Sequence, residues 1–194
     1  VYKRQMFESH PTGLRDVSAF TVPLLSDRRG GFVKLLSALS SSVTGEFEVK
    51  EVFATLSTKN VLRGLHFQSP PKDQSKYVVV LSGSVHEVVV DIRTGSPTYG
   101  TTTSLFLSAP GTDTGHPTGI FVPSGFAHGY VVLSEEATVL YIADHDFNAE
   151  LDGGIAWDST GADWPVVEPI LSDKDLQLPR LADFNSPFLF KGAH

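Results

Sequence analysis

The stretch VLRGLHFQ (residues 61–68) reads as a buried strand that carries an arginine and a histidine. Regular alternation along a strand predicts that Arg63 and His66 face opposite sides of it. Lys76 follows closely, directly before the apolar run YVVVL (77–81), which predicts a second buried strand. Two cationic side chains and a histidine beside elements that must lie in a core are suited to act on a negatively charged group.

The chain on both sides of this stretch is a succession of short apolar runs separated by Gly, Pro and Ser. Their length and alternation predict strands, and no helical pattern stands between them. The expected strands cover 47–57, 61–68, 77–81, 85–92, 102–108, 119–122, 128–133 and 138–143. This pattern predicts an all-β fold, an antiparallel sandwich or barrel.

The two ends of the chain show a weaker pattern. Residues 1–18 are polar and predict a loosely held N-terminal arm. Residues 19–25 alternate as a strand, and Pro23 places that strand at a sheet edge. Residues 32–39 carry apolar side chains on one helical face and predict a short helix. Residues 144–194 predict loops and short helices packed on the outside of the barrel.

The composition limits the class of protein. The 194 residues are 41% hydrophobic, which suits a single domain over residues 1–194. The formal net charge is −7 without any Lys/Arg-rich run, so nucleic acid is not an expected partner. The absence of cysteine excludes disulfides and fits a reducing cytoplasm. No apolar run approaches the ~18–20 residues of a membrane span, and we expect a cytoplasmic protein without a membrane partner.

A second motif, GIFVPSGFAH (119–128), combines a strand, a Pro-x-Gly turn and His128 at the start of the next strand. It resembles the second motif of the cupin barrels, in many of which this histidine binds a metal. The partner motif lacks the His-x-His pair, because Phe and Gln follow His66. We therefore expect no metal. A metal-dependent cupin oxygenase or isomerase that uses His66, His86 and His128 stays open as an alternative.

A set of ordered blocks makes the resemblance more specific. The blocks are VLRGLHFQ (61–68), QSK (74–76), VVVDIR (88–93), SPTYG (96–100), VPSGFAHGY (122–130), LY (140–141), GIAWD (154–158), WP (164–165) and LSDKD (171–175). In this order they are similar to the dTDP-4-dehydrorhamnose 3,5-epimerases, over about residues 27–175. The resemblance implies a cupin jelly-roll barrel, usually a homodimer with strand exchange. It also implies an isomerase without cofactor that acts on a nucleotide-linked 4-keto-6-deoxyhexose.

The resemblance also implies four catalytic roles. His66 corresponds to the base, Asp173 to the carboxylate paired with it, Lys76 to the lysine near the keto oxygen, and Tyr141 to the acid on the opposite face. The chemistry needs these types of group. A histidine oriented by a carboxylate suits removal of the proton next to a ketone, a cation stabilises the enolate oxygen, and a phenol can return a proton.

Five further side chains fall on substrate-binding positions of the family. They are Arg29, Arg63, Glu87, His128 and Phe147, and Glu87 stands where the family usually carries Asp. Phe147 stands where a second tyrosine is usual. A phenyl ring cannot donate a proton, so an enzyme that inverts C3 or C5 alone is an alternative to one that inverts both.

Other departures concern the contacts to the nucleotide sugar. Glu51 and Phe53 stand in a segment where the family usually shows polar amide and histidine contacts, and Lys34 replaces a common Glu. The loop 110–118 is longer than usual. These departures leave open which nucleotide and sugar are bound, and they leave a non-catalytic sugar-nucleotide binding module as a third reading.

Overall fold

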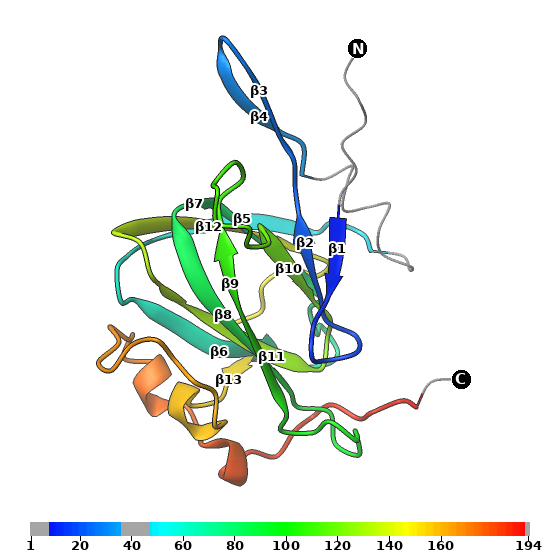
Figure 1. The fold of residues 1–194 in the computed structure, drawn as a ribbon. Helices are drawn as coiled ribbons and strands as arrows, with labels where there is room; N and C mark the ends of the chain where they lie inside the picture. Colours follow the sequence, from blue (N-terminus) through cyan, green and yellow to red (C-terminus); the bar gives the residue numbers. More distant parts are fainter. Residues whose placement is uncertain (1–7, 36–46, 193–194) are drawn as a thin grey trace.

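Two antiparallel sheets face each other and form a jelly-roll barrel (Figure 1). The computed structural model describes residues 8–35 and 47–192. Its strands are β1 (Glu8–Pro11), β2 (Ser18–Thr21), β3 (Leu24–Asp27), β4 (Gly30–Val33), β5 (Glu51–Thr58), β6 (Leu62–Gln68), β7 (Lys76–Ser82), β8 (Ser84–Asp91), β9 (Thr102–Ser108), β10 (Gly119–Val122), β11 (Phe126–Val132), β12 (Glu136–Ala143) and β13 (Asp152–Gly154). One sheet has the order β1-β2-β10-β7-β12-β5, the other has the order β13-β6-β11-β8-β9, and β3 and β4 form a separate two-stranded sheet. The predicted all-β jelly roll is confirmed.

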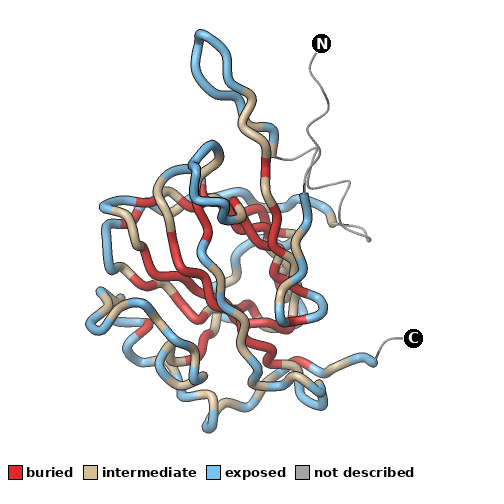
Figure 2. The backbone as a smooth tube through the Cα atoms, viewed as in Figure 1, coloured by how far each residue is buried: buried red, intermediate tan, exposed pale blue. Residues whose placement is uncertain are grey.

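The core lies between the two sheets, where the inward side chains of both meet. Val78 and Val80 from β7 pack there with Val89 from β8 and Val132 from β11. The strands in the middle of each sheet are the most deeply buried parts of the chain (Figure 2). Burial of these alternating β-branched side chains explains why the apolar runs form strands.

The N-terminal segment differs from the expectation. From Glu8 onward it is not a loose arm, because β1 pairs with β2, and Leu14 and Val17 in the connecting loop are buried. Residues 1–7 lie outside the described part of the chain. The single strand expected over 19–25 is also wrong. It is divided into β2 and β3 at the segment containing Pro23, which cannot donate a ladder hydrogen bond.

The helix expected over 32–39 begins in what is a strand. Phe32 and Val33 belong to β4, where Phe32 is the register partner of Leu25 in β3. Residues 36–39 lie outside the described part of the chain. The β3–β4 hairpin projects away from the barrel (Figure 1), so the apolar spacing reflects a hairpin face and not a helical one.

The C-terminal segment packs on the outside of the five-stranded sheet. Its short 3-10 helices are η1 (Trp157–Ser159), η2 (Asp175–Gln177) and η3 (Leu181–Asp183). Phe188 contacts Phe67 of β6 edge to face, with ring centroids 5.6 Å apart. η2 itself contacts β6. Among the described residues, no helix has the length and apolar character needed to cross a membrane.

Candidate active site

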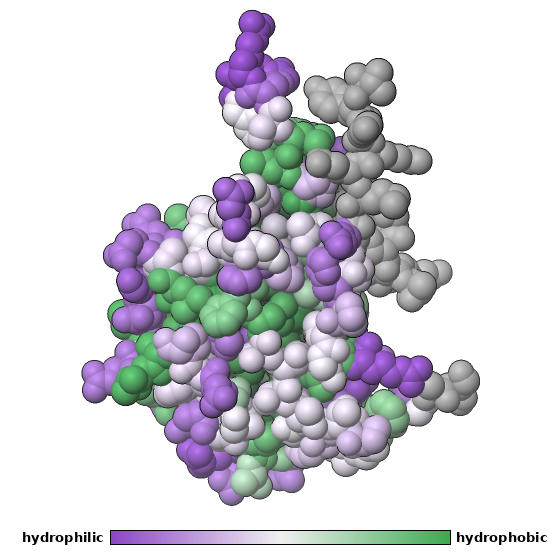
Figure 3. Space-filling model, in the orientation of Figure 1, coloured by the Kyte–Doolittle hydropathy of each residue, from purple (hydrophilic) through white to green (hydrophobic). Residues whose placement is uncertain are grey.

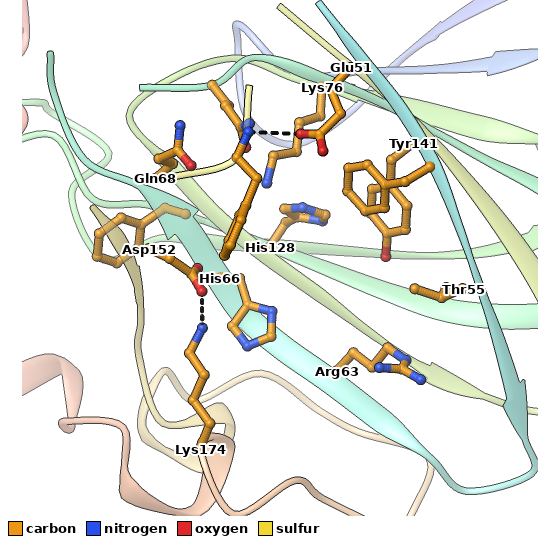
Figure 4. Close-up of a pocket in the computed structure, with 14 residues that line it drawn as sticks. Glu51, Thr55, Arg63, His66, Gln68, Lys76, His128, Tyr141, Asp152 and Lys174 are labelled. Atoms are coloured by element: carbon orange, nitrogen blue, oxygen red, sulfur yellow. Dashed lines mark hydrogen bonds and ion pairs between the residues drawn. The ribbon is translucent and has the colours of Figure 1, made fainter. Parts of the chain in front are cut away.

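A pocket of about 380 Å³ opens between the two sheets (Figure 4). Its volume is in the range of small-molecule sites, about 300–1,000 Å³. It is lined by Glu51, Phe53, Thr55, Arg63, His66, Phe67, Gln68, Gln74, Lys76, His128, Tyr141, Phe147, Asp152 and Lys174. Strands from both sheets therefore bring together residues that are far apart in the sequence.

Arg63 and His66 both face this pocket, which the expected alternation does not allow. The register between β6 and β11 shifts between His128 and Tyr130, as in a β-bulge. Gly64 adopts φ +128°, and a Cβ there would lie 2.6 Å from the Cα of Gly129. The close approach of two glycines permits the irregularity, and the irregularity turns Arg63 to the same side as His66.

His66 is held by a buried carboxylate. Its Nε2 lies 2.6 Å from Oδ1 of Asp175, which is at the start of η2. The same carboxylate accepts hydrogen bonds from the Ser172 hydroxyl and the Gly64 backbone N–H. Burial raises the pKa of Asp175, but these hydrogen bonds outweigh burial and bring the pKa below its ordinary value. Asp175 is therefore ionised at neutral pH.

The expected partner of His66 was Asp173, and that expectation is wrong. Asp173 is exposed and does not line the pocket. The chain turns at this point, and the Asp175 backbone N–H donates to Oγ of Ser172 over 3.1 Å. The turn directs the second aspartate of LSDKD inward and leaves the first at the surface.

The tautomer of His66 follows from this geometry. An ionised carboxylate only accepts, so Nε2 carries the proton that it donates to Asp175. In the neutral ring, Nδ1 then carries the lone pair. The side chain of His66 is 29% exposed and lines the pocket, so the ring is accessible from the pocket. A neutral His66 held in this way can accept a proton at Nδ1.

A second histidine pair lies beside the first. His128 is the register partner of His66, and its Nδ1 lies 2.7 Å from Oε1 of Glu87. Burial raises the pKa of Glu87, while burial and the charges of Lys76 and His66 lower the pKa of His128. Glu87 lies behind His128 and does not line the pocket, so it acts on the site through its hydrogen bond to the His128 ring.

Lys76 supplies a cation at the start of β7. Burial lowers the pKa of its ammonium group, and the carboxylates of Asp152, Glu51 and Asp144 act in the opposite direction. A partly desolvated cation of this kind attracts a developing negative charge more strongly than an exposed one.

Tyr141 lines the same pocket as His66, from the other sheet (Figure 4). Its side chain on β12 is nearly buried, and its ring lies 6.2 Å from that of His128. Burial raises the pKa of the phenol well above its ordinary value. Tyr141 is therefore a neutral phenol at pH 7, able to donate a proton.

Arg63 and an ion pair at the rim add polar groups. Nε of Arg63 donates to Oγ of Ser57 over 3.0 Å, which holds the guanidinium at the pocket wall. Lys174 and Asp152 form an ion pair at the opening (Figure 4). Sequence reasoning did not assign Lys174, Asp152 or Asp175 to the site, although two of them lie in the LSDKD block.

Two other expected site residues have different positions. Phe147 lines the pocket, and its backbone N–H donates to Oε2 of Glu51 over 2.9 Å. Arg29 does not line it. Arg29 lies at the turn of the β3–β4 hairpin, where it is exposed and pairs with Asp27 over 2.6 Å.

The three histidines of the metal-dependent alternative do not converge. His86 points to the outside of β8, where its Nε2 bonds to the Asp163 carbonyl oxygen over 3.1 Å and its ring contacts Phe106. It is not a pocket residue. Within residues 8–35 and 47–192, no three His, Cys, Asp or Glu side chains are grouped so that they could hold a metal ion. The set of His66, His86 and His128 is therefore contradicted.

Comparisons with known proteins agree with the resemblance found in the motifs. The family model described as dTDP-4-dehydrorhamnose 3,5-epimerase matches residues 11–183. The chain is 36% identical over 176 residues to the dTDP-4-dehydrorhamnose 3,5-epimerase of Shigella flexneri, covering 89% of this chain and 94% of that protein.

Solved structures of similar proteins extend the comparison. The structure of dTDP-6-deoxy-D-glucose-3,5-epimerase from Legionella pneumophila, in complex with dTDP-4-keto-L-rhamnose, superposes with a TM-score of 0.87 at 29% identity, covering 96% of this chain and all of that one. A 3'-monoepimerase from Streptomyces bikiniensis, in complex with dTDP-quinovose, superposes with a TM-score of 0.79 at 28% identity, covering 89% and 87%.

Proposed function

Because the chain belongs to the dTDP-4-dehydrorhamnose 3,5-epimerase family, we propose that it inverts C3, C5 or both in a dTDP-linked 4-keto-6-deoxyhexose. The expected family and its enzyme class, an isomerase, are confirmed. The observation that carries the proposed mechanism is that His66, which is hydrogen-bonded to Asp175, and the Tyr141 phenol line one pocket.

In the proposed first step, Nδ1 of His66 removes the proton from a carbon next to the C4 ketone. The Asp175 carboxylate holds the ring in the required tautomer and stabilises the imidazolium that forms. The electron pair of the broken C–H bond moves to the keto oxygen and gives an enolate. Lys76 and His128 stabilise that oxygen from the pocket wall.

In the proposed second step, the enolate carbon takes a proton from the opposite face. Tyr141 is a neutral donor on the other sheet from His66, which suits this role. The resulting phenolate is reprotonated from solvent, while His66 loses its proton to solvent. The net change is inversion of one carbon, with no oxidant or reductant consumed.

Phe147 favours a more restricted form of this function, in which the enzyme inverts C3 or C5 but not both. It lines the pocket without a hydroxyl group, so Tyr141 is the phenol that the described lining residues provide. A relative from Streptomyces niveus, 29% identical over 177 residues, is named dTDP-4-dehydrorhamnose 3-epimerase. We infer that inversion is restricted to one of the two carbons in this chain.

The experiment that tests the function is exchange in D2O, followed by NMR. The enzyme is incubated with dTDP-, GDP- and UDP-linked 4-keto-6-deoxyglucose. We expect deuterium to enter C3, C5 or both of the dTDP sugar. Protium retained at both carbons with every nucleotide contradicts the proposal, and ligand binding without exchange identifies the non-catalytic binding module.

Replacing Tyr141 with Phe separates proton removal from inversion. We expect exchange within about 3-fold of the wild type and inversion reduced about 100-fold, because the ring remains but its proton is lost. NMR measures both from the same reaction. Tyr99→Phe, an exposed tyrosine away from the pocket, is the matched control. Inversion at the wild-type rate in Tyr141→Phe assigns the acid to another group.

We further propose a homodimer in which the β3–β4 hairpin reaches a second copy. The hairpin has a hydrophilic tip and a hydrophobic base (Figure 3), and Phe32 on it is exposed. Among the described residues, strand β5 pairs with β12 alone and exposes Val52 and Leu56, which suits coverage by another chain. Since Arg29 does not line its own pocket, its substrate-binding role requires the partner's pocket.

Sedimentation and kinetics test this arrangement. We expect a dimer at micromolar concentration. We also expect Arg29→Ala to raise KM about 10-fold, because a charged hydrogen bond to the substrate is lost. The variant should remain a dimer. A monomer with full activity contradicts it. The single domain over residues 1–194 and the cytoplasmic location stay predictions.

A further inference from the structure

The ring of Tyr141 is covered by a side chain that the mechanism above does not use. Phe53 on β5 is the register partner of Tyr141 on β12. The two rings are nearly parallel, with centroids 4.6 Å apart and an interplanar angle of 6°. Directly opposed residues of an antiparallel pair share one face of the sheet, so this stack is built into the strand register.

Phe53 lies on the outer side of the stacked pair, and Tyr141 lies on the inner side. β5 is the last strand of its sheet, so Phe53 lies on the outer side of Tyr141. Tyr141 is 6% exposed and Phe53 is 37% exposed. Phe53 therefore takes the solvent contact that Tyr141 would otherwise have, and it also forms part of the pocket wall.

A stacked neighbour restricts how a phenol can move. The Tyr141 ring can swing outward, toward β5, only if Phe53 moves first. On its other side lies the ring of His128, 6.2 Å away. The two rings therefore limit the sideways movement of the Tyr141 ring, whose hydroxyl is also hydrogen-bonded to Tyr130. Displacement of a catalytic group by about 1 Å can cost about 100-fold in rate.

We propose that Phe53 is a positioning residue that holds the Tyr141 phenol against the inverting face of the enolate. The inference rests on the proposed function. The enolate can take a proton on the new face, which gives inversion, or regain one on the original face. In this proposal, Phe53 determines the ratio of these two outcomes. Proton removal by His66, from the other sheet, does not depend on this stack.

The test compares exchange with inversion in Phe53→Ala, Phe53→Tyr and the wild type. We expect Phe53→Ala to exchange substrate deuterium within about 3-fold of the wild type and to form inverted product at least about 10-fold more slowly. Phe53→Tyr keeps an aromatic ring on Tyr141 and is expected to restore the wild-type ratio within about 2-fold.

Thr58→Ala is the matched control. Thr58 is the last residue of β5, is exposed and does not line the pocket, so the substitution shortens a side chain on the same edge strand without changing the stack. Thermal unfolding of each variant measures the structural effect separately.

If Phe53 has a merely structural role, Phe53→Ala lowers the rates of exchange and inversion together and leaves their ratio unchanged. That result overturns the inference. Failure of Phe53→Tyr to restore the ratio also overturns it. Wild-type enzyme that shows no exchange refutes the proposed function itself, which is a different outcome from an unchanged ratio in an active enzyme.

Discussion

Replacement of His66 by alanine is expected to abolish deuterium exchange into the sugar and to lower kcat/KM at least about 1,000-fold. Nε2 of His66 is hydrogen-bonded to Asp175, which leaves Nδ1 to act as the base. General base catalysis of this kind raises the reaction rate about 100- to 10,000-fold. Inversion at either carbon begins with loss of the proton next to the ketone. Removal of the base therefore stops exchange as well as inversion, in contrast to Tyr141→Phe.

The controls separate chemistry from folding. His66→Ala leaves the buried Asp175 carboxylate without its main partner, which destabilises the folded state. His66→Asn can still donate a hydrogen bond but is not a base, and it is expected to be equally inactive with a smaller loss of stability. His116→Ala removes an exposed histidine that stacks on Phe106 away from the pocket, and should retain activity. Normal exchange by His66→Ala refutes the mechanism.

The sequence predicts the barrel strands well because each has one face in a shared core. When apolar side chains occupy every second position, an extended strand is the conformation that turns them all toward the core. The predicted strand 102–108, for example, coincides with β9. The errors lie where that constraint is absent. Residues 32–35 belong to a projecting hairpin and its exit, so their apolar spacing reports no packing against the barrel.

The site was predictable in its residue types and less so in its geometry. Motif blocks identify His66, Lys76 and Tyr141, which the structure brings to one pocket. Alternation fails at Gly64, because the approach of Gly129 depends on a strand that is more than sixty residues away in the chain. No local pattern around residues 61–68 shows that the partner strand shifts its register.

The choice between the two aspartates of LSDKD illustrates the same limit. Asp173 and Asp175 are two residues apart, and both are carboxylates in a loop without an apolar period. What distinguishes them is the tertiary contact of η2 with β6. That contact aims three donors at Asp175, from His66, Ser172 and the Gly64 backbone. Asp173 remains at the surface.

This distinction gives the second large expected effect. Asp175→Asn should lower kcat/KM about 1,000-fold, whereas Asp173→Asn should stay within about 2-fold of the wild type. The amide has nearly the same shape as the carboxylate but lacks the charge that stabilises the imidazolium. Its NH2 group can also donate to the ring nitrogen, which moves the ring proton to Nδ1, the nitrogen that must be free to act as the base.

Steady-state kinetics and deuterium exchange on both variants measure the difference, and the two variants carry the same chemical change two residues apart. Asp175→Asn should lose exchange and inversion in equal proportion, because it acts through the base that starts both reactions. Loss of activity in Asp173→Asn with normal activity in Asp175→Asn contradicts the pairing seen at 2.6 Å. Equal activity in both variants means that His66 needs no carboxylate to act as the base.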